Sequence, residues 1–133
     1  MKVNVSKTKE YYDSISKDLL CDCGYCHSYR SQVKSTFPEV SEYLKSLGID
    51  IEKPFETSPL EPDENGMLEY CGCQYVVFGV CESDYHHRID NVEFRKATSY
   101  PRTGIEQEHF ILEFFPIKLK FDKGVRNGKK ELQ

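Results

Sequence analysis

A long extended segment in the middle of the chain constrains the fold most. Apolar side chains share one parity of this segment, which is the pattern of a β-strand with one buried face. They are Leu68, Tyr70, Val76, Phe78 and Val80. Asn65-Gly66 just before the segment is typical of a tight hairpin turn, because both residues accept positive φ angles. The pattern predicts a long strand that follows a hairpin turn, with Gly72 and Gly79 as bulges or points of close backbone approach.

Two helices are predicted before this strand. Residues 9–20 begin polar and turn apolar only at Leu19-Leu20, which predicts a loosely held arm that leads into a short strand. Apolar side chains at helical spacing then predict a first helix that ends near Ser35. They are Tyr25, Tyr29 and Val33. A second helix is expected to begin at Thr36-Phe37-Pro38-Glu39, which fits a capping box, and to end at Gly48, where a left-handed cap is favoured.

Shorter strands are predicted on either side of the long one. Three prolines between residues 50 and 62 exclude a helix there and permit only a short edge strand. Val92 and Phe94 alternate with charged residues, which is typical of a half-buried strand. The last segment, 108–121, is interrupted by Pro116, where we expect a bend or a change of register.

Helices followed by strands in this order indicate an α+β domain. We predict two N-terminal helices packed on a three- to four-stranded, mainly antiparallel sheet. A chain of 133 residues with 38% hydrophobic content closes one core and has little room for a second. We therefore predict a single α+β domain over residues 1–122 and a flexible basic tail over residues 123–133.

The charge balance argues against one large class of partner. Acidic side chains number 22 against 18 basic ones, and the two signs are mixed along the chain. Such a surface lacks the positive field that neutralises phosphates, so we expect no nucleic-acid partner. We also expect no membrane partner, because no window approaches the roughly 18 apolar residues of a membrane span. The first residues lack an apolar secretory stretch, and we expect a cytoplasmic protein.

Six cysteines carry the chemistry of this sequence. In a reducing cytosol they favour metal ligation, redox chemistry or burial over disulfides. Cys23 and Cys26 have the two-residue gap of a zinc knuckle. Cys71 and Cys73 lie two apart in a strand and are therefore expected to point to the same side. Four thiolates suit a tetrahedral zinc ion, which is the candidate cofactor. The candidate ligands are Cys23, Cys26, Cys71 and Cys73, with Cys21 and His27 as alternates.

Other interpretations of these cysteines stay open. Reduced thiols that simply pack in the core would leave no site. The string Cys23-Gly24-Tyr25-Cys26 at the start of a helix is also typical of a dithiol redox centre, because the helix dipole stabilises a thiolate there. The stretch before it is too polar for the buried strand of a thioredoxin-like fold, so we rank this hypothesis below metal binding. With His27 the string matches the rule for covalent haem attachment, a match we regard as accidental because attachment occurs outside the cytosol.

Motifs spread over most of the chain carry a resemblance to a known family. They are Cys23-x2-Cys26-x-Ser28-Tyr29, Phe37-Pro38, Leu47-Gly48-Ile49-Asp50, Lys53-Pro54-x-Glu56, Tyr70-x-Gly72-x-Gln74-Tyr75 and Leu112-Glu113-Phe114. The chain resembles a family of small uncharacterised bacterial proteins, mostly from Gram-positive anaerobes and bacilli. The resemblance implies that the first cysteine pair belongs to the shared pattern, and that Cys21, Cys71 and Cys73 are additions of this sequence. It implies no activity.

We therefore predict a non-enzymatic domain that binds a partner protein, as an accessory or immunity-like factor, with a structural zinc at its cysteines. The alternative is a thiol redox or metal-dependent enzyme that uses Cys23 and Cys26. Glu56 is the predicted binding residue outside the cysteines, because it follows Pro54 in an irregular segment where a carboxylate has little structural role. We name no catalytic residue, since no P-loop, dinucleotide loop or deaminase motif occurs.

Overall fold

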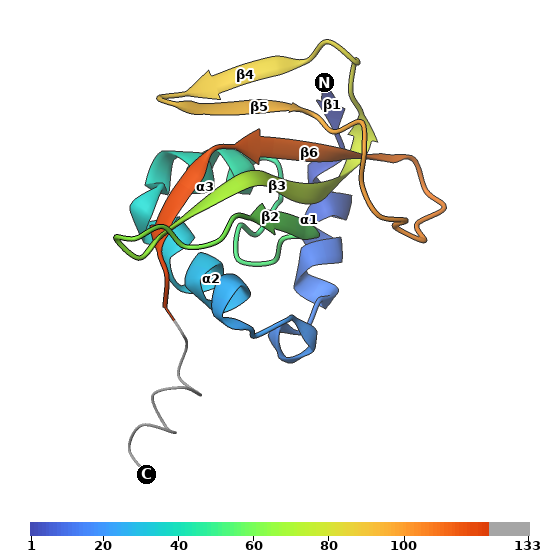
Figure 1. The fold of residues 1–133 in the computed structure, drawn as a ribbon. Coiled ribbons are helices and arrows are strands. Elements are labelled where there is room, and N and C mark those ends of the chain that lie inside the picture. The colour runs from blue at the N-terminus through green and yellow to red at the C-terminus, as the bar shows by residue number, and fades with distance from the viewer. Residues whose placement is uncertain (123–133) are drawn as a thin grey trace.

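Helices and strands follow one another broadly as the sequence predicts, but both are more numerous. A computed structural model describes residues 1–122, in which three α-helices and a seven-stranded sheet form an α+β fold (Figure 1). The helices are α1 (Val5–Ser14), α2 (Gly24–Thr36) and α3 (Pro38–Ser46), with a short 3-10 helix, η1 (Lys17–Leu19), before α2. The strands are β1 (Lys2–Val3), β2 (Glu56–Pro59), β3 (Met67–Val80), β4 (His86–Ile89), β5 (Val92–Lys96), β6 (His109–Phe115) and β7 (Ile117–Lys120). The α+β class is confirmed, while the predicted two helices and three to four strands are too few. The predicted tail, residues 123–133, lies outside the described residues.

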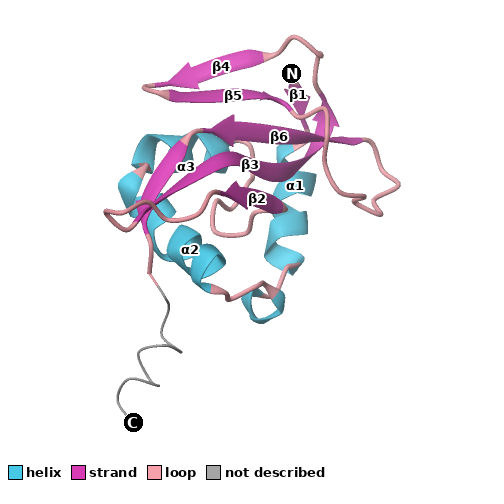
Figure 2. Cartoon of the chain, in the orientation of Figure 1, coloured by secondary structure: helices cyan, strands magenta, loops and turns pink. Residues whose placement is uncertain are grey.

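Strand β3 organises the sheet (Figure 2). It pairs along one edge with β6 and β7, and along the other with β1 and β2. Strands β5 and β4 extend the sheet beyond β6, so that the order is β1-β3-β6-β5-β4. Every one of these pairs is antiparallel, as expected.

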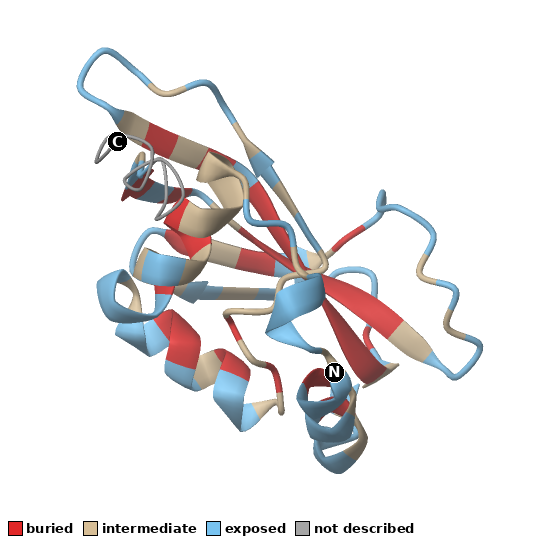
Figure 3. Cartoon of the chain, turned by 90° about the horizontal axis from the view of Figure 1, so that it is seen from below, coloured by how far each residue is buried: buried red, intermediate tan, exposed pale blue. Residues whose placement is uncertain are grey.

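The main core lies between the helices and one face of the sheet. The helices contribute Tyr12, Tyr29, Val33, Val40 and Leu44, and the strands contribute Leu68, Tyr70, Cys73, Tyr75, Val77, Phe94, Phe114 and Ile117, among others. A smaller cluster on the opposite face holds Val76, Phe78, Ala97 and Ile111. Figure 3 shows the helices with buried stretches beside exposed ones, as amphipathic packing requires. No helix within residues 1–122 combines the length and apolar character needed to cross a bilayer.

Strand β3 changes face halfway along its length. Leu68 and Tyr70 belong to the main core, yet so do Tyr75 and Val77, which lie at positions of the other parity. The predicted single apolar face is therefore wrong. The change occurs at Cys71-Gly72, where two residues of β3 lie opposite one residue of β2 and the register shifts. The predicted bulge is thereby confirmed.

Three other special positions also behave as predicted. Pro116 separates β6 from β7, which pair with the two halves of β3. Gly48 follows α3 with a φ of 89°, the left-handed cap expected there. Gly79 has a φ of 137°, and a Cβ at this position would lie 2.1 Å from the Lys2 carbonyl oxygen. Only glycine therefore allows β1 to approach β3 so closely.

The sequence pattern fails to predict three elements, α1, β1 and β4, and predicts one helix cap wrongly. Helix α1 covers much of the predicted arm, but only Thr8 and Tyr12 are buried, so its apolar stripe is too short to recognise. The sequence signal for it was Asn4, whose side chain caps the helix. Strands β1 and β4 have only 2 and 4 residues. The capping box is wrong, because Thr36 is the last residue of α2 and Phe37 is the N-cap of α3.

Candidate metal centre

Three cysteines converge where η1 leads into α2. Cys23 is the N-cap of α2 with an extended backbone, Cys26 lies in the first turn, and Cys21 precedes both. Their sulfur atoms all lie within 4.8 Å of one another. Cys21 is exposed and the other two are half-buried, so the group lies at the surface. We call these three residues the thiol cluster.

Close packing fixes the helix start that carries the thiol cluster. Gly24 approaches the ring of Phe121 so closely that a Cβ would lie 2.9 Å from its Cε1 atom. The carbonyl of Tyr25 accepts a hydrogen bond of 2.6 Å from the hydroxyl of Tyr70 on β3. The first turn of α2 is therefore held between the sheet and the segment that follows β7, and glycine between the cysteines lets the ring of Phe121 lie directly against the helix.

The thiols of Cys23 and Cys26 have shifted pKa values, in opposite directions. Burial raises the pKa of Cys23, but this is outweighed by hydrogen bonds from the amide of Cys26, from the thiols of Cys21 and Cys26, and from the amide of Tyr25. The pKa of Cys23 therefore falls below the usual thiol range, as expected at a helix N-terminus. Burial raises the pKa of Cys26 to about 12, and its bonds to the neighbouring thiols add to this effect. Without a metal, negative charge is thus favoured on Cys23 over Cys26.

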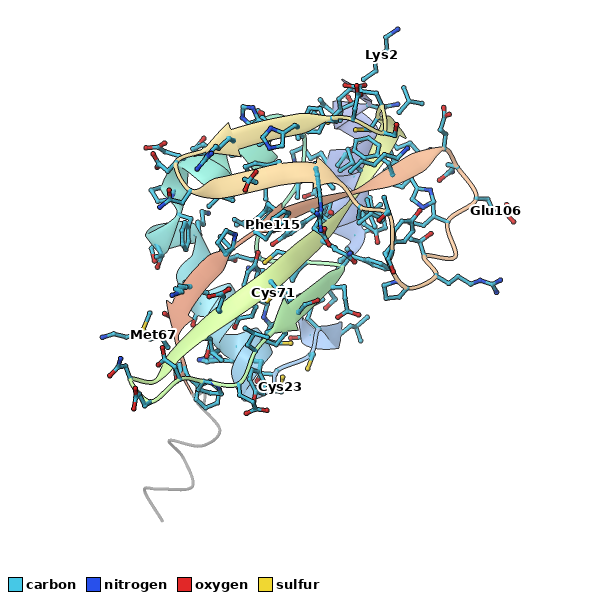
Figure 4. All side chains as sticks on the ribbon, turned by 45° about the horizontal axis from the view of Figure 1, so that its top comes forward. Lys2, Cys23, Met67, Cys71, Glu106 and Phe115 are labelled. Carbon is cyan, nitrogen blue, oxygen red and sulfur yellow. The ribbon has the colours of Figure 1, made fainter. Side chains whose placement is uncertain are left out.

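The two strand cysteines do not join the thiol cluster. Within residues 1–122, no group of three or more close ligands includes Cys71 or Cys73. Cys71 is exposed, whereas Cys73 is buried in the main core. The sequence predicted that both sulfurs point to one side, but the bulge at Gly72 changes the face of the strand between them. Figure 4 shows Cys23 at the start of α2 and Cys71 apart from it on β3.

The two alternate ligands have different positions. Cys21 belongs to the thiol cluster, for which the C-x-C spacing in an extended segment was the available signal. His27 is absent from that group of close ligands. Its Nδ1 lies 3.7 Å from Asp22 Oδ1 and its Nε2 lies 3.4 Å from Asp122 Oδ2. The described structure thus pairs His27 with carboxylates rather than with thiols.

A pocket of about 190 Å³ opens beside the thiol cluster. Cys21 and Cys26 line one side, and Glu56 lines it from β2. The carboxylate of Glu56 accepts a hydrogen bond of 3.2 Å from the amide of Thr57 and is otherwise exposed. The residue that the sequence singled out for binding and two of its candidate cysteines therefore face the same pocket.

The donor set suits a thiophilic metal ion. Zinc bonds to thiolate sulfur at about 2.3 Å, which in a tetrahedral site separates neighbouring sulfurs by about 3.8 Å. The sulfurs of the thiol cluster lie within 4.8 Å of one another. Rotation of these surface side chains about their χ1 angles is enough to bring the sulfurs to the tetrahedral separation. Among the described residues, no fourth cysteine, histidine or carboxylate lies within the same group.

No protein-family model matches this chain, and neither curated proteins nor solved structures gave a match. The membership suggested by the motifs is therefore a proposal, and the site rests on its own geometry.

Proposed function

We propose that this chain is a metal-binding domain whose thiol cluster holds a zinc ion. The observation that carries the proposal is the mutual approach of the sulfurs of Cys21, Cys23 and Cys26 within 4.8 Å. Thiolate ligands select zinc and other soft ions over hard cations such as magnesium and calcium. The helix N-terminus adds to this preference, because its dipole stabilises the negative charge that the ligands carry.

The ion has a structural role in this proposal. Cys21 lies in the segment that leads from η1, and Cys26 lies inside α2. Coordination of both sulfurs joins that surface segment to a helix already fixed on the sheet. Because zinc binds the folded arrangement, its binding free energy adds to the free energy of unfolding.

We also propose that the domain acts by binding a partner protein, as an accessory factor of the bacterial family it resembles and in the cytoplasm. One feature supports this role. Leu19 of η1 is 85% exposed and stands at the pocket beside the thiol cluster. Single exposed apolar side chains are ordinary on protein surfaces, so it is the position beside the site that makes Leu19 the contact to test, and Leu19→Ser does so without disturbing the core.

A dithiol redox centre is the second candidate function. It is favoured by the placement of Cys23 as the N-cap of α2, with Cys26 one turn later and within reach of it. In that chemistry the Cys23 thiolate attacks a substrate disulfide, and Cys26 then displaces the second substrate sulfur. The products are a Cys23–Cys26 disulfide and a substrate that carries two reduced sulfurs.

Zinc titration of the full chain, purified under reducing conditions, tests the first candidate. We expect one zinc ion per chain by elemental analysis, and a melting temperature that rises with zinc and falls again with a chelator. Replacing any member of the thiol cluster by serine is expected to weaken zinc binding by more than the roughly 10–100-fold typical of outer-shell changes. Competition with a chromophoric chelator measures this loss.

Cys71→Ser is the matched control, because Cys71 is an exposed cysteine outside the cluster. It is expected to leave zinc affinity unchanged. If it weakens binding as much as Cys26→Ser does, the three-thiol assignment is wrong and the four-cysteine site expected from the sequence is correct. If the chain binds no zinc but forms a reversible Cys23–Cys26 disulfide, the redox function replaces the metal function.

A further inference from the structure

We infer that a small amino-acid thiol, of the chemical class of cysteine, completes the coordination of the metal from the pocket beside the thiol cluster. The inference rests on the proposed function, since it needs the ion in place. It starts from the number of protein ligands. The thiol cluster offers three sulfurs, and a closed structural zinc site takes four ligands, so a further molecule supplies the fourth.

Two of the three thiols border a defined space. Cys21 and Cys26 both line the pocket of about 190 Å³, so an ion held between them is adjacent to it. That volume corresponds to about six water molecules at roughly 30 Å³ each. It is below the roughly 300 Å³ at which pockets for drug-sized ligands begin. A molecule of a few heavy atoms therefore fills it.

The charged side chains that line the pocket indicate a zwitterionic ligand, with one positive and one negative group. Arg30 lines the pocket, and its side chain is 19% exposed. One of its nitrogens donates to Asp22 Oδ1 at 3.1 Å, and a guanidinium has five N–H donors, so it can also hold a carboxylate. Glu56 lines the same pocket and is suited to an ammonium group. A carboxylate, an ammonium and a metal-binding atom on one small skeleton describe an α-amino acid with a coordinating side chain.

Sulfur is the coordinating atom that the site favours. A zinc ion with three thiolates already prefers soft donors, and a fourth thiolate completes the four-sulfur set of closed zinc sites. The incoming thiol releases its proton as it binds. Pro54 and Phe55 form an apolar wall for the carbon skeleton.

Calorimetry on the zinc-loaded full chain, with L-cysteine as the probe, tests the inference. Arg30→Lys and Glu56→Gln are each expected to raise the Kd for L-cysteine about tenfold or more, because a guanidinium–carboxylate pair and an ion pair are lost. Zinc stoichiometry is expected to stay at one in both variants. Matched controls are Arg102→Lys and Glu64→Gln, at exposed positions outside this pocket, which leave the Kd unchanged.

Two further readouts identify the coordinating atom. L-Serine, which lacks the sulfur, is expected not to bind. In cobalt-loaded protein, L-cysteine is expected to add thiolate-to-metal charge-transfer absorption. A chain that binds zinc but not L-cysteine overturns this inference and leaves the proposed function standing, and so does binding that Arg30→Lys and Glu56→Gln leave unchanged. Removal of zinc from the chain by L-cysteine overturns it as well, and a chain that binds no zinc overturns both.

Discussion

Two cysteine pairs with the same C-x-C spacing lie in opposite environments in this molecule. Before α2, Cys21 and Cys23 bring their sulfurs within 4.8 Å of each other at the surface. In β3, Cys71 is exposed, whereas Cys73 is 0% exposed and contacts the hydroxyl of Tyr29. Burial raises the pKa of Cys73 to about 12, so this thiol stays protonated as part of the core.

The backbone between the cysteines makes the difference. The chain turns from η1 into α2 at Cys21 and Cys23, and this turn brings their sulfurs together with that of Cys26. The bulge at Gly72 interrupts the side-chain alternation of β3 and turns the two side chains to different environments. The same spacing thus gives a close group of thiols in the connection before α2 and none in the strand, so spacing alone does not define a metal site.

Alkaline pH is expected to have the largest effect on the free energy of unfolding. It acts on the tyrosines of the main core that surround Cys73, whereas the thiol cluster lies at the surface. Tyr29 and Tyr75 hydrogen-bond each other at 2.6 Å, and burial raises the pKa of both well above the usual range. In the unfolded chain they ionise at about pH 10. The folded protein keeps protons that the unfolded chain releases, so stability present below this pH is lost as pH rises. The loss is about 1.4 kcal/mol per pH unit for each tyrosine, or about 3 kcal/mol for the pair.

Urea unfolding at a series of pH values above about 10 measures this loss, with tyrosinate absorbance followed in parallel. Tyr75→Phe is the matched variant, because it removes one titrating group and is expected to lower the slope by about 1.4 kcal/mol per pH unit. Tyrosinate absorbance that reaches its full value while the near-ultraviolet circular dichroism of the fold is intact would show that these side chains are not buried as described.

Serine substitutions in the β3 pair are expected to have the next largest effect. Cys73→Ser places a smaller hydroxyl group in the main core and is expected to lower the free energy of unfolding by about 1–3 kcal/mol. Cys71→Ser changes an exposed side chain and is expected to stay within about 0.5 kcal/mol of the parent. Urea unfolding in the presence of reductant measures both. Equal losses for the two variants would abolish the distinction between them on which the comparison rests.

The sequence predicts most of the regular structure and only part of the site. Helix α3, the turn at Gly66 and the break at Pro116 each depend on local rules of spacing, turn chemistry and proline geometry, and the structure contains all three. The face change in β3 depends instead on its pairing with β2, which no local pattern of residues 67–80 encodes. The shared pocket of Cys21 and Glu56 likewise depends on contacts between segments far apart in the sequence, so the sequence predicts each residue separately and not their proximity.

The smallest expected effect on the free energy of unfolding comes from a substitution in α2, the helix that carries Cys26 of the thiol cluster. Ser28 is buried, and its Oγ accepts a hydrogen bond of 2.6 Å from the amide of Asp122, beyond β7. Ser28→Ala leaves that amide without this partner and is expected to lower the free energy of unfolding by about 1 kcal/mol. Ser31→Ala, at an exposed position of the same helix, is the control and is expected to change it by less than about 0.5 kcal/mol.

Zinc affinity measured in the same two variants makes the comparison sharper. The positions of the sulfurs in the thiol cluster depend on the N-cap and first turn of α2. The contacts of Gly24 and Tyr25 hold this turn in place in addition to Ser28. Ser28→Ala is therefore expected to weaken the fold while changing zinc affinity by only a few-fold. A loss of zinc binding as large as that of Cys26→Ser would mean that the geometry of the surface cluster is set by the contact of α2 with the segment after β7. Zinc binding and the packing of the core would then be coupled. The two cysteine pairs would differ only in their exposure to solvent.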